Sequence, residues 1–329
     1  MLLILSRKDD EHVHFLLPVL RRRAVEHRWI DTGDFPARAA ISVHFGGGAA
    51  PRRRLHFDGA PLELDRVDAV WFRYPLNPAP DERVDAGARP GVTQLSRAVL
   101  LGLSDTLDAR WLPATPRVVA AAQNKLQQLT VAPRFGFTVP RTLVTNDPGE
   151  ALAFWEACEG RMVAKLVSRL DAAHAPAGWS GMATHVVRRR DVANLAGLRY
   201  APMILQEYVP KRLELRVTVV GGRVFPCGID SQASRATRHD WRHHDADRAG
   251  LAPHALPDDV AARCVRLVEA YGLRYGAVDL VLTPAGDHVF LELNPMGEWA
   301  FVQTETGMPI ADAVVDLLAG APDDAFVHA

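Results

Sequence analysis

The sequence predicts an α/β protein with an antiparallel α+β part toward its C-terminus, and three observations support that fold class. Short apolar runs alternate with stretches of helical spacing over the first third of the chain, which is typical of a mainly parallel sheet. Two β-type runs, 277–282 and 289–293, flank the turn sequence TPAGD and indicate a hairpin. At 329 residues the chain is long enough for about two or three domains.

Composition and charge exclude several classes of protein. Hydrophobic residues make up 48% and charged residues 23%, the values of a soluble globular protein. Lys plus Arg number 38 against 39 for Asp plus Glu, and this net charge of −1 gives no electrostatic case for a nucleic-acid partner. No stretch approaches the ~18 apolar residues that span a membrane, and the apolar run at 2–5 is too short for a signal peptide. Because the three cysteines are widely spaced, we expect no disulfide framework and a cytoplasmic location.

The first third is expected to form a sheet with a covering helix. Residues 2–5 are a buried-type strand, 11–26 show helical spacing, and 28–31 form a second short strand. Residues 69–74, AVWFRY, form another strand, which a proline stops. Arg73 lies where this strand ends, and α/β folds place ligand contacts at strand ends. Arg73 is therefore a candidate substrate contact.

The middle of the chain is expected to be a second unit that begins after a proline-flanked linker at 113–116. We expect a helix at 117–135 and strands at 142–145, 161–167 and 184–188. A further helix should begin at 146–150, where a capping residue is followed by a proline and an acid. Asp191 should cap a short helix. The segment 168–181 contains glycines and no regular period, so we expect a mobile loop there.

The last part is expected to be rich in strands. We expect strands at 203–208, 213–220, 223–228, 277–282 and 289–293, and helices at 258–271 and 310–318. The polar segment 231–256 has no regular period and is too long for an idle connection in a compact domain.

The hairpin predicts a metal site. Glu292 stands inside an apolar strand that Asn294 and a following proline end, and Asp279 lies in the paired strand. Three hard oxygen ligands at one end of two paired strands suit Mg²⁺, which also takes phosphate oxygens and water. The alternative is that Glu292 faces solvent from an edge strand while Asp279 caps a turn.

A second set of residues predicts a nucleotide site. Lys165 lies in the apolar strand MVAKL directly before a glycine-containing loop, an arrangement that suits phosphate, although the lysine could also extend to the strand end. Lys125 is a second candidate phosphate contact. The backbone of the segment Gln206, Glu207, Tyr208 and Val209 could pair with an adenine edge, and Glu214 could take ribose hydroxyls.

The order of these motifs resembles the ATP-grasp ligases, and more narrowly the ligases of the microviridin or graspetide type that crosslink ribosomally made peptides. The narrower resemblance rests on TGDFP from Thr32, VWFRYP from Val70, TLVTNDP from Thr142 and NPMGEWAFVQTETGMPIADA from Asn294. It covers nearly the whole chain. It implies an ATP-grasp fold in three parts: a Rossmann-like pre-ATP-grasp domain at 1–116, a central lid domain at 117–204 and a catalytic domain at 205–329.

The resemblance also implies roles for individual residues. Lys125 and Lys165 would hold ATP phosphates, residues 206–209 the adenine, and Glu214 the ribose. Asp279, Glu292 and Asn294 would hold Mg²⁺, and Arg216 and Arg242 would meet the γ-phosphate and the acyl-phosphate. Some relatives place an arginine two residues before the metal aspartate, where this sequence has Ala277.

The function that the resemblance implies is an ADP-forming ligation. Asp or Glu side chains of a precursor peptide become acyl-phosphates, and Ser or Thr hydroxyls or Lys amines then form ω-esters or ω-amides. The loop at 168–181 would exclude water, Asp191 and Asn194 would contact the peptide's leader, and the enzyme would be a homodimer. The alternatives are a ligase that joins free amino acids or adds glutamate to a protein, and a catalytically silent, ATP-dependent peptide-binding protein.

Overall fold

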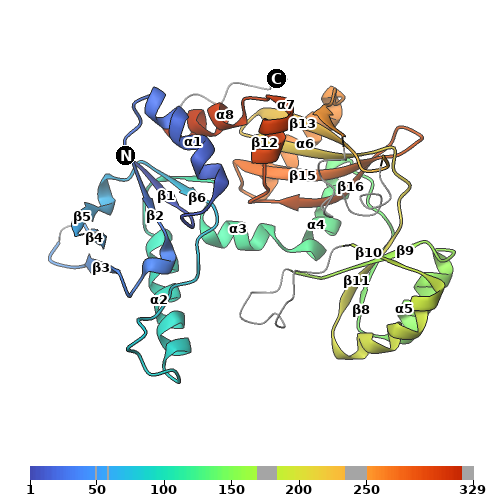
Figure 1. The fold of residues 1–329 in the computed structure, drawn as a ribbon, viewed down its shortest axis with the longest axis horizontal. Helices are drawn as coiled ribbons and strands as arrows, with labels where there is room; N and C mark the ends of the chain where they lie inside the picture. The colour runs from blue at the N-terminus through green and yellow to red at the C-terminus, as the bar shows by residue number, and fades with distance from the viewer. Residues whose placement is uncertain (49, 58, 169–183, 234–249, 321–329) are drawn as a thin grey trace.

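Four β-sheets organise the described part of the chain (Figure 1). The computed structural model describes every residue except 49, 58, 169–183, 234–249 and 321–329. Within the described residues, no helix combines the length and the apolar character needed to cross a membrane.

The N-terminal sheet is parallel throughout, as predicted. Its strand order is β2 (His27–Ile30), β1 (Leu2–Leu5), β6 (Ala69–Phe72) and β7 (Arg110–Leu112). Helix α1 (Glu11–Arg22) connects β1 to β2, and the side chain of Asp10 caps it by accepting the N–H of His12. The strand order changes direction between β1 and β6, so the crevice beyond their carboxyl ends is the place where such folds bind ligands.

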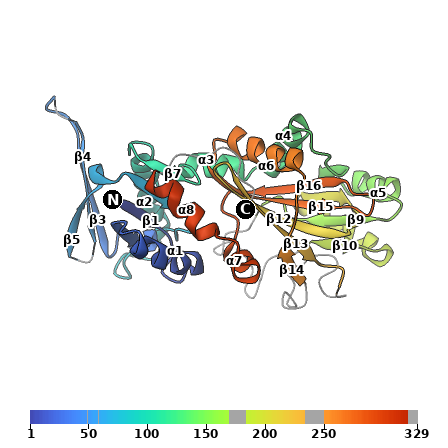
Figure 2. The same ribbon diagram turned by 90° about the horizontal axis from the view of Figure 1, so that it is seen from above.

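Several elements of the N-terminal region were not predicted, β7 among them. An antiparallel sheet of β3 (Ala39–His44), β4 (Arg52–Phe57) and β5 (Ala60–Glu63) lies at the end of the molecule farthest from α5 (Figure 2). Helix α2 (Arg89–Ser104) follows β6, and short 3₁₀ turns occupy Thr32–Asp34 and Leu64–Arg66.

The single helix expected at 117–135 is wrong, because the chain breaks there. Helix α3 (Pro116–Ala122) ends, α4 (Lys125–Val131) begins, and a 3₁₀ turn, η3 (Ala132–Phe135), follows. The side chain of Asn124 accepts the N–H groups of Leu126 and Gln127 and so restarts the helix. Lys125 is therefore the first residue of α4.

The central sheet is antiparallel, with the order β10 (His185–Val187), β9 (Met162–Lys165), β11 (Met203–Glu207) and β8 (Thr142–Thr145). Helix α5 (Pro148–Ala157) and the 3₁₀ segment η4 (Arg189–Tyr200) share an apolar core with one face of this sheet. Helix α5 begins as predicted, with Asp147 as its cap. Asp191 caps η4 as expected, but from inside its first turn, because η4 begins at Arg189 and the side chain of Asp191 accepts the N–H of Arg188.

The C-terminal sheet has the order β14 (Gly250–Pro253), β13 (Arg223–Asp230), β12 (Leu213–Val220), β15 (Tyr275–Leu282) and β16 (His288–Asn294). Its neighbouring strands are antiparallel, and β14 lies inside the segment that was expected to be irregular. Helix α6 (Asp258–Ala270) covers one face of the sheet with an apolar core.

A second apolar core joins the N-terminal and C-terminal sheets. Helices α7 (Ala300–Thr306), which was not predicted, and α8 (Ile310–Ala319) return to pack beside α1. This core contains Val220, Phe225 and Tyr275 of the C-terminal sheet together with Leu16 and Val13 of α1. The chain segment between β16 and α7 therefore runs directly between the two sheets.

Candidate functional site

Asp279 and Glu292 lie directly opposite each other on β15 and β16. The register shifts just beyond them, so that Leu280 pairs with Phe290 and the pairing skips Leu291. This bulge turns Phe290 into the α6 core while Glu292 faces the opposite side with Asp279. The side chains of Asp279 and Glu292 are 16% and 21% exposed, so neither residue stands free in solvent.

Asn294 completes the cluster of these three predicted metal ligands. Its Nδ2 donates to Oδ2 of Asp279 and to Oε1 of Glu292, both at 3.2 Å. The side-chain amide of Asn294 therefore bridges the two acids. If this amide flips, its oxygen takes the place of Nδ2 and faces the same point. Two carboxylates and one amide oxygen converging on one point fit a hard divalent cation that takes its remaining ligands from phosphate and water.

Each acid has a cation beside it. Arg216 Nε lies 2.9 Å from Asp279 Oδ1, and Lys125 Nζ lies 3.3 Å from Glu292 Oε2. Arg216 comes from β12, opposite Asp279, whereas Lys125 comes from the start of α4. Two positive groups therefore balance the two carboxylates in the ligand-free protein.

Ala277, two residues before Asp279, lies against the backbone of Gly297. A Cβ added at Gly297 would collide with the Cβ of Ala277 and would lie 3.2 Å from Nη1 of Arg216. Ala277 is also fully buried, so a longer side chain at this position would displace Gly297. Arg216 instead brings a guanidinium to Asp279.

Lys165 is held on the inner face of the central sheet, the face opposite α5. Its Nζ donates to Oε1 of Gln206 at 2.8 Å, and Nε2 of Gln206 donates to Oγ1 of Thr142 at 2.9 Å. Lys165 is opposite Ile204 and Gln206 is opposite Thr142, so alternation places all four side chains on this face. Lys165 is thus directed by neighbours on its own sheet.

In the expected adenine segment, the side chains of Gln206 and Glu207 lie on opposite faces of the central sheet. The Glu207 carboxylate forms an ion pair with Arg141 at 2.9 Å, and this hydrogen-bonded arginine lowers the pKa of Glu207. The backbone N–H groups of Glu207 and Tyr208 donate to the carbonyls of Arg141 and Arg161. Among the described residues the N–H of Val209 has no such backbone partner.

Glu214, the expected ribose contact, lies on the same face of β12 as Arg216. Its Oε1 accepts from Nζ of Lys211 at 2.9 Å, and both side chains are nearly buried. The structure thus brings Glu214, Arg216, Asp279, Glu292 and Asn294 onto one face of the C-terminal sheet.

Arg73 lies in the predicted crevice of the N-terminal sheet, but its hydrogen-bond partners there are backbone carbonyls of the same chain. It is 2% exposed, and its Nη1 donates to the carbonyls of Met296 and Gly297 at 2.6 and 3.0 Å. The hydroxyl of Tyr74 also donates to the Met296 carbonyl, at 2.7 Å. These contacts hold the segment that follows Asn294.

A buried histidine that sequence reasoning missed holds the same segment. The N–H of Trp299 donates to Nε2 of His12 at 3.0 Å, so Nδ1 of His12 carries the proton and donates to Oδ1 of Asp10 at 3.0 Å. Burial lowers the pKa of His12, and the hydrogen bond with Asp10 offsets this only in part. His12 is neutral, and no local pattern marks it because Trp299 is 287 residues away.

The remaining predicted residues lie apart from the cluster or outside the described residues. Asp191 Oδ2 accepts the N–H of Arg188 at 2.9 Å, and Asn194 is exposed on η4. Arg242 lies outside the described residues, as does the expected lid from residue 169 onward.

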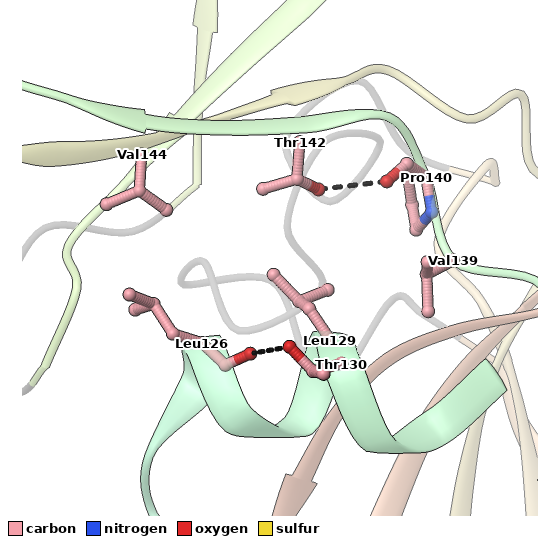
Figure 3. Close-up of a pocket in the computed structure, with 7 residues that line it drawn as sticks. All are labelled: Leu126, Leu129, Thr130, Val139, Pro140, Thr142 and Val144. Atoms are coloured by element: carbon pink, nitrogen blue, oxygen red, sulfur yellow. Dashed lines mark hydrogen bonds between the residues drawn. The ribbon is translucent and has the colours of Figure 1, made fainter. Parts of the chain in front are cut away.

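A cavity of about 380 Å³ separates α4 from the central sheet (Figure 3). Leu126, Leu129 and Thr130 line it from α4, and Val144 and Thr142 line it from β8. The hydroxyls of Thr130 and Thr142 donate to the backbone carbonyls of Leu126 and Pro140. The expected ligand residues do not line it, and Thr142 connects it to Gln206 and Lys165.

Comparisons with known proteins find relatives along nearly the full length. The family model of the MvdD pre-ATP grasp domain matches residues 1–118, and no curated protein matches in sequence. Macrocyclase MdnB from Microcystis aeruginosa MRC is 30% identical, with a TM-score of 0.79 over 97% of this chain and 99% of that chain. Macrocyclase MdnC from the same organism, bound with precursor peptide MdnA, is 28% identical, with a TM-score of 0.83 over 97% and 99%. A Chryseobacterium gregarium RiPP-associated ATP-grasp ligase, in complex with ADP and a leader and core peptide, is 28% identical, with a TM-score of 0.89 over 97% and 96%.

Proposed function

Because the chain belongs to the ATP-grasp ligases of the microviridin, or graspetide, type, we propose that it crosslinks a ribosomally made precursor peptide in an ATP-dependent reaction. It activates Asp or Glu side-chain carboxylates as acyl-phosphates and joins them to Ser or Thr hydroxyls or to Lys amines. The observation that carries this proposal is the convergence of Asp279, Glu292 and Asn294 beside Arg216 and Lys125.

ATP and Mg²⁺ are the proposed cofactors. Asp279, Glu292 and Asn294 would hold the metal ion, which neutralises the two acids and polarises the phosphates when it is bound. Lys125 and Arg216 then lose their carboxylate partners and meet phosphate oxygens instead. Lys165 reaches the phosphates from the inner face of the central sheet, where Gln206 directs it.

The rest of the nucleotide lies between the central and C-terminal sheets in this proposal. The N–H of Val209 donates to the adenine edge, and Gln206 to Tyr208 hold that segment in place. When the side chain of Glu214 rotates away from Lys211, its carboxylate accepts hydrogen bonds from the ribose hydroxyls. Glu207 acts through its backbone, because its carboxylate is paired with Arg141.

The chemistry has two steps. A peptide carboxylate attacks the γ-phosphorus, the bond to the ADP oxygen breaks, and a mixed anhydride forms while Lys165 and Arg216 offset the developing charge. A hydroxyl or amine then attacks the activated carbonyl, phosphate leaves, and the nucleophile loses its proton. Each link therefore consumes one ATP and removes one water from the peptide. Arg242 stays a predicted second arginine for the acyl-phosphate.

We place the three domains at 1–116, 117–207 and 208–329. The family match to 1–118 supports the first boundary, and the second moves from 204 to 207 because β11 pairs with β8 and β9 along its whole length. Asn194, exposed on η4 beside Asp191, is the proposed leader contact. A homodimer and a cytoplasmic location stay predictions.

Intact-mass analysis tests the function. The protein is incubated with ATP, Mg²⁺ and the short acidic peptides encoded beside its gene. We expect the peptide to lose one or more water masses, with one ADP formed per link. ADP formation with free amino acids but no change in peptide mass would instead favour a small-molecule ligase, and nucleotide binding without turnover would favour a silent peptide-binding protein.

A further inference from the structure

The outer edge of β16 is completed by a side chain. β16 is the last strand of its sheet, and an edge strand leaves backbone N–H and C=O groups without a neighbouring strand. Phe290 N–H donates to the carbonyl of Thr138 at 2.9 Å, which covers one part of this edge. At Leu293, Oε1 of Gln128 accepts the N–H at 2.9 Å, and Nε2 of Gln128 donates to the C=O at 2.7 Å. One amide therefore takes the place of a strand at Leu293.

Both the oxygen and the nitrogen of the Gln128 side-chain amide form hydrogen bonds with the backbone. It is 2% exposed, and its Nε2 also donates to the carbonyl of Ala122 at 2.7 Å. A primary amide has the adjacent donor and acceptor that pair with both groups of one backbone residue. A carboxylate lacks the donor, and an apolar side chain of the same length lacks both.

The contact lies between two of the proposed metal ligands. Leu293 separates Glu292 from Asn294, so a shift of its backbone moves both side chains. Gln128 is also three residues after Lys125 on α4, and positions three apart share a helix face. The same face of α4 thus holds the backbone of Leu293 and brings Lys125 to Glu292.

We propose that Gln128 is a positioning residue that sets the distance between the phosphate-binding start of α4 and the metal-binding end of β16. The proposal rests on the proposed function, since it assumes that this cluster binds Mg²⁺ and nucleotide. Gln128 acts through the backbone of Leu293 and makes no contact with the reacting atoms. Residues that orient metal ligands in this way typically change metal affinity by roughly 10- to 100-fold when replaced.

The test compares three variants of the full-length protein. Gln128→Met keeps the length of the side chain and removes its donor and acceptor. Gln127→Met is the matched control, because Gln127 is an exposed neighbour on the same helix. Val265→Ala controls for lost stability, because Val265 belongs to the α6 core on the opposite face of the sheet. Binding of a non-hydrolysable ATP analogue is measured by calorimetry over a series of Mg²⁺ concentrations, and the unfolding free energy of each variant is measured in parallel.

We expect Gln128→Met to raise the Mg²⁺ concentration needed for half-maximal analogue binding by roughly tenfold or more. Gln127→Met and Val265→Ala should keep the wild-type value, even though Val265→Ala loses stability. An unchanged Mg²⁺ requirement in Gln128→Met, or an equal rise in Val265→Ala, would overturn the positioning role. Absence of Mg²⁺-dependent analogue binding in the wild type would overturn the proposed function itself, which distinguishes the two failures.

Discussion

Arg216 and Asp279 form a cross-strand ion pair, with Nε of the arginine 2.9 Å from Oδ1 of the aspartate on neighbouring strands β12 and β15. Both side chains are largely buried, and Gly297 lies against the same guanidinium. This pair explains how a chain with Ala277 two residues before Asp279, the proposed metal ligand, still places an arginine at the proposed phosphoryl-transfer site. Arg216 reaches that site from the adjacent strand.

Arg216→Lys should therefore lower turnover strongly. Lysine places a point charge on a flexible stem and cannot reproduce the planar guanidinium contact. We expect kcat to fall by roughly 100-fold or more, the usual cost of removing a preorganised charge-stabilising group. ADP release in the presence of peptide measures this, with Arg212→Lys, an exposed neighbour, as the control. A wild-type kcat in Arg216→Lys would show that this arginine has no part in the transfer.

Glu292→Gln should abolish turnover while the fold persists. The change keeps the side-chain volume but removes one of the two carboxylate charges at the proposed Mg²⁺ site, and it leaves Lys125 without its carboxylate partner. ADP formation and its Mg²⁺ dependence are the measurements. Glu269→Gln on the exposed side of α6 is the matched control. Normal ADP production by Glu292→Gln, with an unaltered Mg²⁺ requirement, would sink the metal assignment.

Gly297→Ala should be destabilising, and a second change should relieve it. The new Cβ would collide with the Cβ of Ala277, so either the loop or β15 must shift close to Asn294. Overpacking of this kind costs about 1–3 kcal/mol, and activity should fall with stability. In the double variant Ala277→Gly/Gly297→Ala the colliding atom is absent, so we expect the unfolding free energy to recover in part. Additive losses in the double variant would disprove the collision.

His12 should make the stability of the fold depend on pH. Its pKa in the folded protein is lowered from 6.5, chiefly by burial, so it stays neutral where an unfolded histidine takes up a proton. The unfolded state therefore binds more protons as the pH falls below about 6.5, and the unfolding free energy decreases. The loss approaches about 1.4 kcal/mol per pH unit and ends once the pH falls below the pKa of the folded protein.

His12→Gln tests that dependence, because glutamine can replace both hydrogen bonds and does not titrate. We expect the wild type to lose more unfolding free energy than His12→Gln between about pH 7.5 and about pH 5.5. Chemical denaturation at several pH values measures the difference. Parallel curves for the two proteins would mean that the proton affinity of His12 is the same in the folded and unfolded states.

Elements with ends set by neighbouring residues could be predicted from the sequence. Asp147, Pro148 and Glu150 mark the start of α5, and the structure begins the helix there. Strand β12 has the predicted bounds, because its apolar residues continue until a pair of glycines. The hairpin that pairs Asp279 with Glu292 was predictable for the same reason, since a short turn joins its two strands.

Features that depend on distant partners could not be predicted. The bulge at Leu291 decides which face Glu292 occupies, yet FLELN reads as a regular strand. Gln128 looks like an ordinary helix residue, because its partner Leu293 is 165 residues away. Arg73 was predicted in the right place, at a strand end where ligands bind, but the carbonyls of Met296 and Gly297 occupy it.

The fate of the peptide's carboxyl oxygen atoms shows whether an acyl-phosphate forms. A precursor peptide with side-chain carboxyl oxygens enriched in a heavy isotope is incubated with the protein, ATP and Mg²⁺, and the released phosphate is analysed by mass. Activation as an acyl-phosphate predicts one heavy oxygen in phosphate for every link formed, because phosphate leaves with an oxygen of the original carboxylate. Crosslinked peptide with unlabelled phosphate, or with the label in AMP, would contradict the account.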